Sequence, residues 1–295
     1  LERLDAERQA IARAAGADSV AAYRASLVAD PADHAASGAE IVALCEGFLE
    51  RAMAVAPRVF GRLPRAGCVV REVEPYAAPE APPAFYLPPR PDGARPGTFF
   101  VNTMDPAARP LHLFAARAFH EGVPGHHFQL AIETELTGLP VFRTLGSRLA
   151  GAAYTEGWGL YSEGLADELG LYPTARDRFG MLEAQAWRAA RLVVDTGLHA
   201  FRWDRARVIE FLEQAAGLPR IEAENETDRY ISTPGQALAY MIGQRELIDL
   251  RAQLTARLGG AFDLTAFHDA VLGHGALPLA TLRRQLPRWL EPAEV

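Results

Sequence analysis

The segment FHEGVPGHHFQ, residues 119–129, places a proline between histidines in a part of the chain whose spacing is otherwise helical. In a straight helix, His126 would lie about 120° around the axis from His120, and His127 would lie about 10.5 Å further along it. Pro124 cannot donate a hydrogen bond to the carbonyl of His120, and its ring collides with that carbonyl. We therefore expect the helix to bulge at Pro124, which would bring His126 next to His120.

The segments on either side of this stretch predict a mostly α-helical fold. Apolar residues recur three and four positions apart through residues 1–60 and again from about residue 110 to the end of the chain. The region between them is rich in proline and glycine, and we expect a β-hairpin at about 84–104, with strands near 84–87 and 98–101. Helix breaks are expected at four Gly-to-Pro segments, namely 138–140, 170–173, 217–219 and 275–278.

The composition excludes several classes of function. The 295 residues include 30 basic and 37 acidic side chains, giving a net charge of −7, and every basic residue is arginine. A net negative charge argues against a nucleic-acid partner. The absence of lysine excludes Schiff-base, pyridoxal-phosphate and P-loop chemistry. Two cysteines, Cys45 and Cys68, are too few for a disulfide framework or a cysteine-cluster zinc site.

The sequence also bears on where the protein works. No apolar run approaches the ~18 residues of a membrane span. The chain opens LERLDAERQ, which has neither the basic nor the apolar part of a secretory signal. The cytoplasm is therefore the default location, and an export signal in a preceding N-terminal segment would change that expectation.

His120-Glu121 begins like the motif H-E-x-x-H, in which two histidines one helical turn apart bind Zn²⁺ and the glutamate activates water. The fifth position is Pro124, so the second ligand would have to be His126 or His127. A histidine-rich segment can equally form a structural cluster without a metal. The motif alone leaves metal binding and a structural role about equally plausible.

A carboxylate on the next predicted helix favours a metal. The segment YTEGWGLYSE, residues 154–163, places Glu156 among small and aromatic residues, where an unpaired charge would be costly. Two histidines and one glutamate are a known ligand set for catalytic zinc. Glu163 lies seven residues later on the same helical face, and there we expect a solvated side chain rather than a ligand.

Two further groups of residues could complete a site. Arg188, Arg191, Asp195 and His199 form one polar stripe along a predicted helix, which suits either a buried ion-pair network or substrate contacts. Tyr240 begins another predicted helix, where its hydroxyl could donate to a developing oxyanion, although most helical tyrosines pack in a core.

Six segments in the same order resemble the bacterial DUF885 proteins, and the resemblance covers nearly the whole chain from about residue 70. DUF885 proteins are themselves similar to the gluzincin zinc metallopeptidases, including the carboxypeptidase Taq and oligopeptidase groups. The segments are DGARPGTFFVNT (92–103), HEGVPGHHFQ (120–129), YTEGWGLYSEGLADELGLY (154–172), WRAARLVVDTGLH (187–199), RYISTPGQALAYMIG (229–243) and FHDAVLGHGALPL (267–279).

The resemblance implies an α-rich, gluzincin-like metallopeptidase fold with a small β-hairpin before the metal-binding helix. Residues 61–295 would form the catalytic domain, and residues 1–60 would be a helical segment left from a longer N-terminal region. The implied cofactor is one Zn²⁺ per chain. The implied residues are His120, His126 and Glu156 as ligands, with His127 as the alternative to His126, Glu121 as general base, and Tyr240 with His199 or Arg191 near the oxyanion.

The hypothesis from the sequence is a zinc-dependent hydrolase, a metallopeptidase that cleaves peptide bonds with metal-activated water. One alternative is a zinc hydrolase of a small non-peptide amide. The other is a non-catalytic helical protein with a structural metal or histidine cluster. A peptide or small amide is the expected partner, and the strand around residues 98–102 could pair with an extended substrate.

Overall fold

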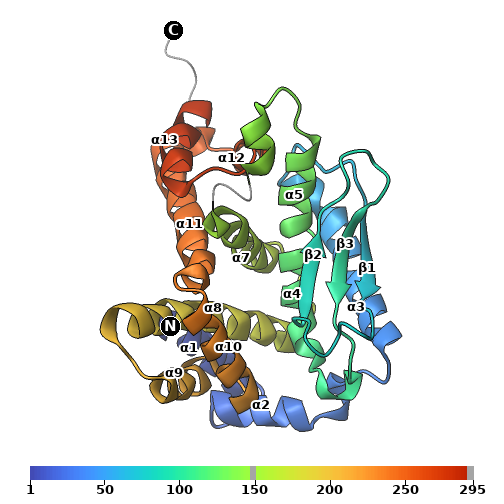
Figure 1. Ribbon diagram of the computed structural model, residues 1–295, viewed down its shortest axis with the longest axis vertical. Helices are drawn as coiled ribbons and strands as arrows, with labels where there is room; N and C mark the ends of the chain where they lie inside the picture. Colours follow the sequence, from blue (N-terminus) through green and yellow to red (C-terminus); the bar gives the residue numbers. More distant parts are fainter. Residues whose placement is uncertain (147–150, 291–295) are drawn as a thin grey trace.

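A computed structural model of the chain describes residues 1–146 and 151–290. It is mostly helical with one small sheet, as the spacing predicted (Figure 1). The four Gly-to-Pro segments all fall between helices, whereas the helical continuation expected over 147–150 and 291–295 lies outside the described residues. The α-helices are α1 Glu2–Ala14, α2 Val20–Ala29, α3 Gly38–Val55, α4 Phe114–Glu121, α5 His126–Glu135, α7 Ala152–Glu168, α8 Ala175–Phe201, α9 Arg205–Phe211, α10 Arg220–Ser232, α11 Ala239–Leu258, α12 Leu264–Leu272 and α13 Leu279–Leu290.

The three-stranded sheet contains the predicted hairpin and one strand that the sequence analysis missed. β2 (Ala84–Leu87) pairs antiparallel with β3 (Gly97–Val101), as expected. β1 (Cys68–Glu72) pairs parallel with β3, so the strand order is β1-β3-β2. Because β3 is the central strand, both of its edges are already hydrogen-bonded. The expectation that a substrate pairs with residues 98–102 is therefore wrong.

One hydrophobic core joins the sheet to most of the helices. In Figure 1 the sheet and α3 lie on one side of α4 and α5, while α7 and α11 lie on the other side. The core includes Phe48 of α3, Phe99 of β3, Phe119 of α4 and Trp158 of α7. Of the helices in residues 1–60, α3 packs into this core, whereas α1 and α2 pack mainly against α8 in two smaller apolar clusters. A smaller apolar cluster joins α8 to α9 and α10.

Among the described helices, none combines the length and the apolar content that crossing a membrane would require.

His268 is a fully buried histidine in the centre of this core. Its Nδ1 lies 2.8 Å from the carbonyl oxygen of Val59, and its Nε2 lies 2.8 Å from the hydroxyl of Tyr161. The ring also stacks on Phe60, with 4.7 Å between the ring centroids. Burial lowers the pKa of His268 to about 4, although the Val59 carbonyl opposes this shift. The imidazole is therefore neutral in the folded protein.

We expect His268 to make the protein less stable in mild acid. Between pH 6.5 and 4, the histidine is protonated in the unfolded chain and neutral in the folded chain, so stability is complete above pH 6.5 and falls as the pH drops. Down to pH 4, this loss amounts to about 3 kcal/mol. Urea unfolding of the wild type and His268→Gln at pH 7 and pH 4 would measure it. An equal loss in both proteins would contradict the assignment to His268.

Candidate metal centre

The break between α4 and α5 brings two histidines together. We expected one helix with a bulge at Pro124. Instead, α4 stops at Glu121 and α5 begins at His126. The backbone of Gly125 lies so close to the end of α4 that a Cβ atom there would be 1.9 Å from the carbonyl oxygen of His120. Only glycine fits this approach. As a result, the imidazole centroids of His120 and His126 are 4.7 Å apart, which confirms that the two histidines are neighbours.

Glu156 of α7 completes a three-residue cluster. Its Oε2 lies 3.5 Å from the Nε2 of His120 and 3.5 Å from the Nε2 of His126. Charge-assisted hydrogen bonds between such groups are about 2.7–2.9 Å long, so Glu156 faces both rings without bonding tightly to either. The structure therefore brings together the two histidines and the glutamate that the sequence singled out.

Glu121 borders the same cluster from α4. One of its carboxylate oxygens, Oε2, lies 3.9 Å from the Nε2 of His126. Possible ligand atoms of His120, Glu121 and His126 also lie within 4.8 Å of one another, so Glu121 is a rival for the third ligand. We favour Glu156 because its oxygen is equally close to both imidazoles. Glu121 would then stand beside the ion, which suits a general base.

Glu163 is the carboxylate that the sequence analysis misjudged. It is 1% exposed rather than solvated, because α7 turns this face towards α4 and α8. Its Oε1 accepts a 2.8 Å hydrogen bond from the Nδ1 of His120, and its Oε2 accepts one of 3.1 Å from Gln185 of α8. Gln244 of α11 donates in turn to the side-chain oxygen of Gln185 at 2.8 Å. Ligand histidines commonly donate their second ring nitrogen to a carboxylate in this way.

The carboxylates give the cluster a strong preference for positive charge. Burial lowers the pKa of His120, but the neighbouring carboxylates of Glu156 and Glu163 outweigh burial and raise it to about 9. Burial would raise the pKa of Glu156, yet the two histidines hold it well below its usual value. The cluster therefore stabilises positive charge, which protons on the histidines or a metal ion could supply.

Two glycines allow Glu156 and the start of α11 to meet. Gly157 and Gly243 face each other where α7 crosses α11, and a Cβ on Gly157 would lie 2.4 Å from the Cα of Gly243. This approach places Tyr240 against the cluster, with its ring centroid 6.2 Å from that of His120 and the planes 28° apart. The structure thus brings Tyr240 beside His120, while its role near an oxyanion stays a prediction.

A cavity of about 470 Å³, here called the metal cavity, opens onto the cluster. Part of its wall is formed by the edge strand β2 and the residues just before it, Pro82–Tyr86. Three arginines also line it, namely Arg117 of α4 and Arg188 and Arg191 of α8. Arg191 is buried and donates to the hydroxyl of Tyr230 and to Glu226. Its guanidinium carbon lies 4.5 Å from the centroid of Tyr240. Arg191 therefore supports Tyr240 and is itself held by α10.

Two candidates from the sequence lie elsewhere. The Nδ1 of His127 lies 2.8 Å from the hydroxyl of Tyr86, so its ring turns towards the sheet, and burial lowers its pKa to about 4. His126, rather than His127, therefore lies beside His120 and faces Glu156. His199 is outside the set of described residues that line the metal cavity, and its Nε2 lies 3.0 Å from the carbonyl oxygen of Tyr230. Its placement beside α10 corrects the expectation that it contacts the substrate.

Comparison with protein families matches residues 1–286 to the family described as bacterial protein of unknown function (DUF885). The chain belongs to the DUF885 family. A search of curated proteins finds no match to it.

Two solved structures share the fold of this DUF885 chain. One, described as a "putative lipoprotein" from Colwellia psychrerythraea, is 36% identical, with a TM-score of 0.93. The match covers 98% of this chain and 50% of the Colwellia chain. The other, described as a "putative lipoprotein of unknown function" from Shewanella oneidensis, is 20% identical, with a TM-score of 0.81. The match covers 97% of this chain and 54% of the Shewanella chain. The DUF885 chain thus spans about half the length of each.

The glycine contact between α7 and α11, which lies next to Glu156, can be tested through the stability of the DUF885 chain. Gly157→Ala should reduce the free energy of unfolding by about 1–3 kcal/mol, because the new Cβ meets backbone atoms of α11. Gly164→Ala on the same helix is the matched control, since nothing lies within 4 Å of its new Cβ, and it should stabilise by up to about 1 kcal/mol. Urea unfolding measures both, and equal effects would argue against a tight helix contact.

Proposed function

We propose that this DUF885 chain is a zinc-dependent metallopeptidase whose metal is held by His120, His126 and Glu156. The observation that carries the proposal is the position of the Glu156 Oε2, 3.5 Å from each of the two histidine Nε2 atoms. In addition, the order of ligands along the chain and the glutamate after the first histidine resemble the gluzincin peptidases. That resemblance is why we propose peptide hydrolysis in preference to another use of the metal.

The residues fit a zinc ion by the chemistry and the spacing of their donor atoms. Two ligands of a tetrahedral zinc ion lie about 3.3 Å apart when each bond is about 2.0–2.1 Å long. The two 3.5 Å separations are close to that value, and both are too long for strong hydrogen bonds. Two imidazoles and one carboxylate also leave a fourth position for water, as in catalytic zinc sites.

When bound, Zn²⁺ lowers the pKa of a coordinated water from ~15.7 towards ~7 and polarises a carbonyl oxygen. Glu121 lies beside His126 at the cavity and would accept the proton of the attacking water. It would then deliver this proton to the nitrogen of the leaving amine. Tyr240 would donate its hydroxyl proton in a hydrogen bond to the oxygen of the tetrahedral species. Arg191 would position Tyr240, and His199 has no part in this proposal.

The metal cavity favours this function over the alternatives. A structural zinc site is closed by four protein ligands, whereas His120, His126 and Glu156 all border a cavity of about 470 Å³. The cavity is also bordered by an edge strand, β2, which can pair with an extended peptide in a way that a small amide cannot.

We also infer that the protein is exported, because the 36% identical Colwellia protein carries the lipoprotein description. This inference replaces the cytoplasmic default. Fractionation of the source bacterium would test it, since recovery with cytosolic markers would contradict export.

Protein purified without added metal should contain one zinc per chain by elemental analysis. His126→Ala and Glu156→Gln should each lose most of it, because each removes one of three ligands. His127→Ala is the matched control and should keep the zinc, since its ring bonds to Tyr86. Zinc that survives in His126→Ala but disappears in His127→Ala would overturn the ligand assignment.

Glu121→Gln should keep its zinc and lose at least about 10²-fold in turnover, because the amide cannot accept a proton from water. The assay is cleavage of a library of N-acetylated peptides by the zinc-loaded protein, followed by mass spectrometry. Glu46→Gln, an exposed residue of α3, is the charge-matched control and should cleave at the wild-type rate. Loss of zinc in Glu121→Gln would instead make Glu121 a ligand, and full turnover would exclude it as the base.

A further inference from the structure

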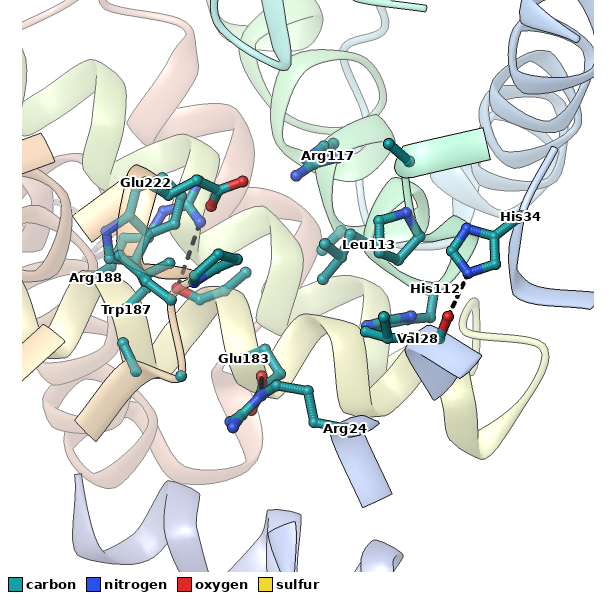
Figure 2. Close-up of a pocket in the computed structure, with 18 of the residues that line it drawn as sticks. Arg24, Val28, His34, His112, Leu113, Arg117, Glu183, Trp187, Arg188 and Glu222 are labelled. Atoms are coloured by element: carbon teal, nitrogen blue, oxygen red, sulfur yellow. Dashed lines mark hydrogen bonds and ion pairs between the residues drawn. The ribbon is translucent and has the colours of Figure 1, made fainter. Parts of the chain in front are cut away.

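A second cavity adjoins the metal cavity. It has a volume of about 560 Å³ and is here called the side chamber. Its wall is largely apolar and includes Val28 and Leu113 (Figure 2) as well as Leu218. Its acidic groups are Glu222, Glu183, which is paired with Arg24, and Glu163, which is bonded to His120, and its other arginines are Arg117 and Arg188. The two cavities share Arg117, Trp187 and Arg188. The side chamber thus continues the metal cavity, and two guanidinium groups stand at the junction.

Neither guanidinium at the junction is neutralised within the described part of the chain. Arg117 forms no hydrogen bond or ion pair there, and its guanidinium carbon lies 5.2 Å from the centroid of the Phe114 ring. Arg188 makes one long hydrogen bond, 3.4 Å, to the carbonyl oxygen of Ala184. Its Nε is buried without a partner. Both side chains are half-buried, and leaving two such charges without a counter-ion is costly, which indicates that an anion completes this junction.

The surroundings increase the local positive charge. Arg188 and Arg191 both lie over the ring of Trp187, with guanidinium carbons 4.5 and 4.2 Å from its centroid. Glu226 compensates Arg191, so Arg188 remains the uncompensated member of this pair. Burial lowers the pKa of Arg117 to about 10, which leaves it charged at neutral pH. Glu222 attracts Arg117 electrostatically, but it is exposed and more than 4 Å away.

The guanidinium groups of Arg117 and Arg188 lie close to the proposed metal ligands. Tyr240 separates them, since its ring centroid is 6.2 Å from that of His120 and 6.0 Å from the guanidinium carbon of Arg188. Arg117 precedes His120 by three residues on α4, which is about 4.5 Å along the helix axis. An extended residue spans about 3.3–3.6 Å. A peptide with its scissile bond at the metal would therefore reach the junction within one to three residues.

We propose that Arg117 and Arg188 bind the C-terminal carboxylate of a peptide substrate, and that the side chamber takes the apolar side chain of its last residue. This proposal rests on the proposed peptidase function and narrows it to a carboxypeptidase that releases one to three residues. A guanidinium pair suits this ligand because it can donate several charge-assisted hydrogen bonds to one carboxylate. The apolar wall beyond the pair favours residues such as leucine over charged ones.

Binding to the metal-free protein tests the carboxylate site without requiring turnover. The probes are acetyl-Ala-Ala-Leu and its C-terminal amide, titrated by calorimetry. The wild type should bind the acid at least 10-fold more tightly than the amide, since only the acid can form charge-assisted bonds. Arg188→Gln and Arg117→Gln should each reduce this ratio to 3-fold or less. Arg284→Gln, an exposed arginine of α13 that borders neither cavity, removes the same charge and should keep the wild-type ratio.

A ratio near one in the wild type, or an unchanged ratio in both cavity variants, would overturn the proposal. Circular dichroism would show whether either arginine variant is misfolded. If one of them is, the other still tests the proposal. Turnover of the same two peptides by the zinc-loaded wild type separates the two proposals. Equal cleavage of acid and amide would retain the peptidase and reject the carboxylate site. Tight binding of the acid without cleavage would retain the site and reject the peptidase.

Discussion

The candidate site depends on the close approach of Gly125 to the carbonyl oxygen of His120. This approach lets the chain leave α4 and begin α5 within four residues, so that two histidines six positions apart become neighbours. A side chain at Gly125 would collide with backbone that cannot move away, because Phe119 packs in the central core. The pairing of the two imidazoles is therefore a consequence of backbone sterics, and the histidine side chains only have to occupy the positions that the break provides.

Much of this arrangement could be predicted from the sequence. Apolar spacing located the helices, Gly-to-Pro segments located their ends, and the residue types around His120 and Glu156 identified the cluster. The exact form of the break could not be predicted, because Pro124 alone is compatible with a bulge or an interruption. β1 was missed because a five-residue strand whose partner lies about 30 residues away leaves almost no local signal.

Glu163 and His199 show why the rest of the site needed a structure. Both are polar residues on helical faces, and helical spacing does not reveal what packs against a face. The first face meets α4 and α8, so a carboxylate expected in solvent becomes a buried acceptor. The second meets α10, so a histidine expected in the cavity bonds to a backbone carbonyl. Tertiary packing decided both outcomes.

The hydrogen-bond chain from Gln244 through Gln185 to Glu163 has a fixed direction, with consequences for His120. The amide group of Gln244 donates to the oxygen of Gln185, which leaves the amide nitrogen of Gln185 to donate to Glu163. Glu163 can then only accept from His120, so the Nδ1 of the ring keeps its proton, and Nε2 is the nitrogen that would release one to a metal ion. The ring nitrogen that faces Glu156 is thus distinguished from the other by a chain of hydrogen bonds that reaches α11, where Gln244 is outside the residues that line the metal cavity.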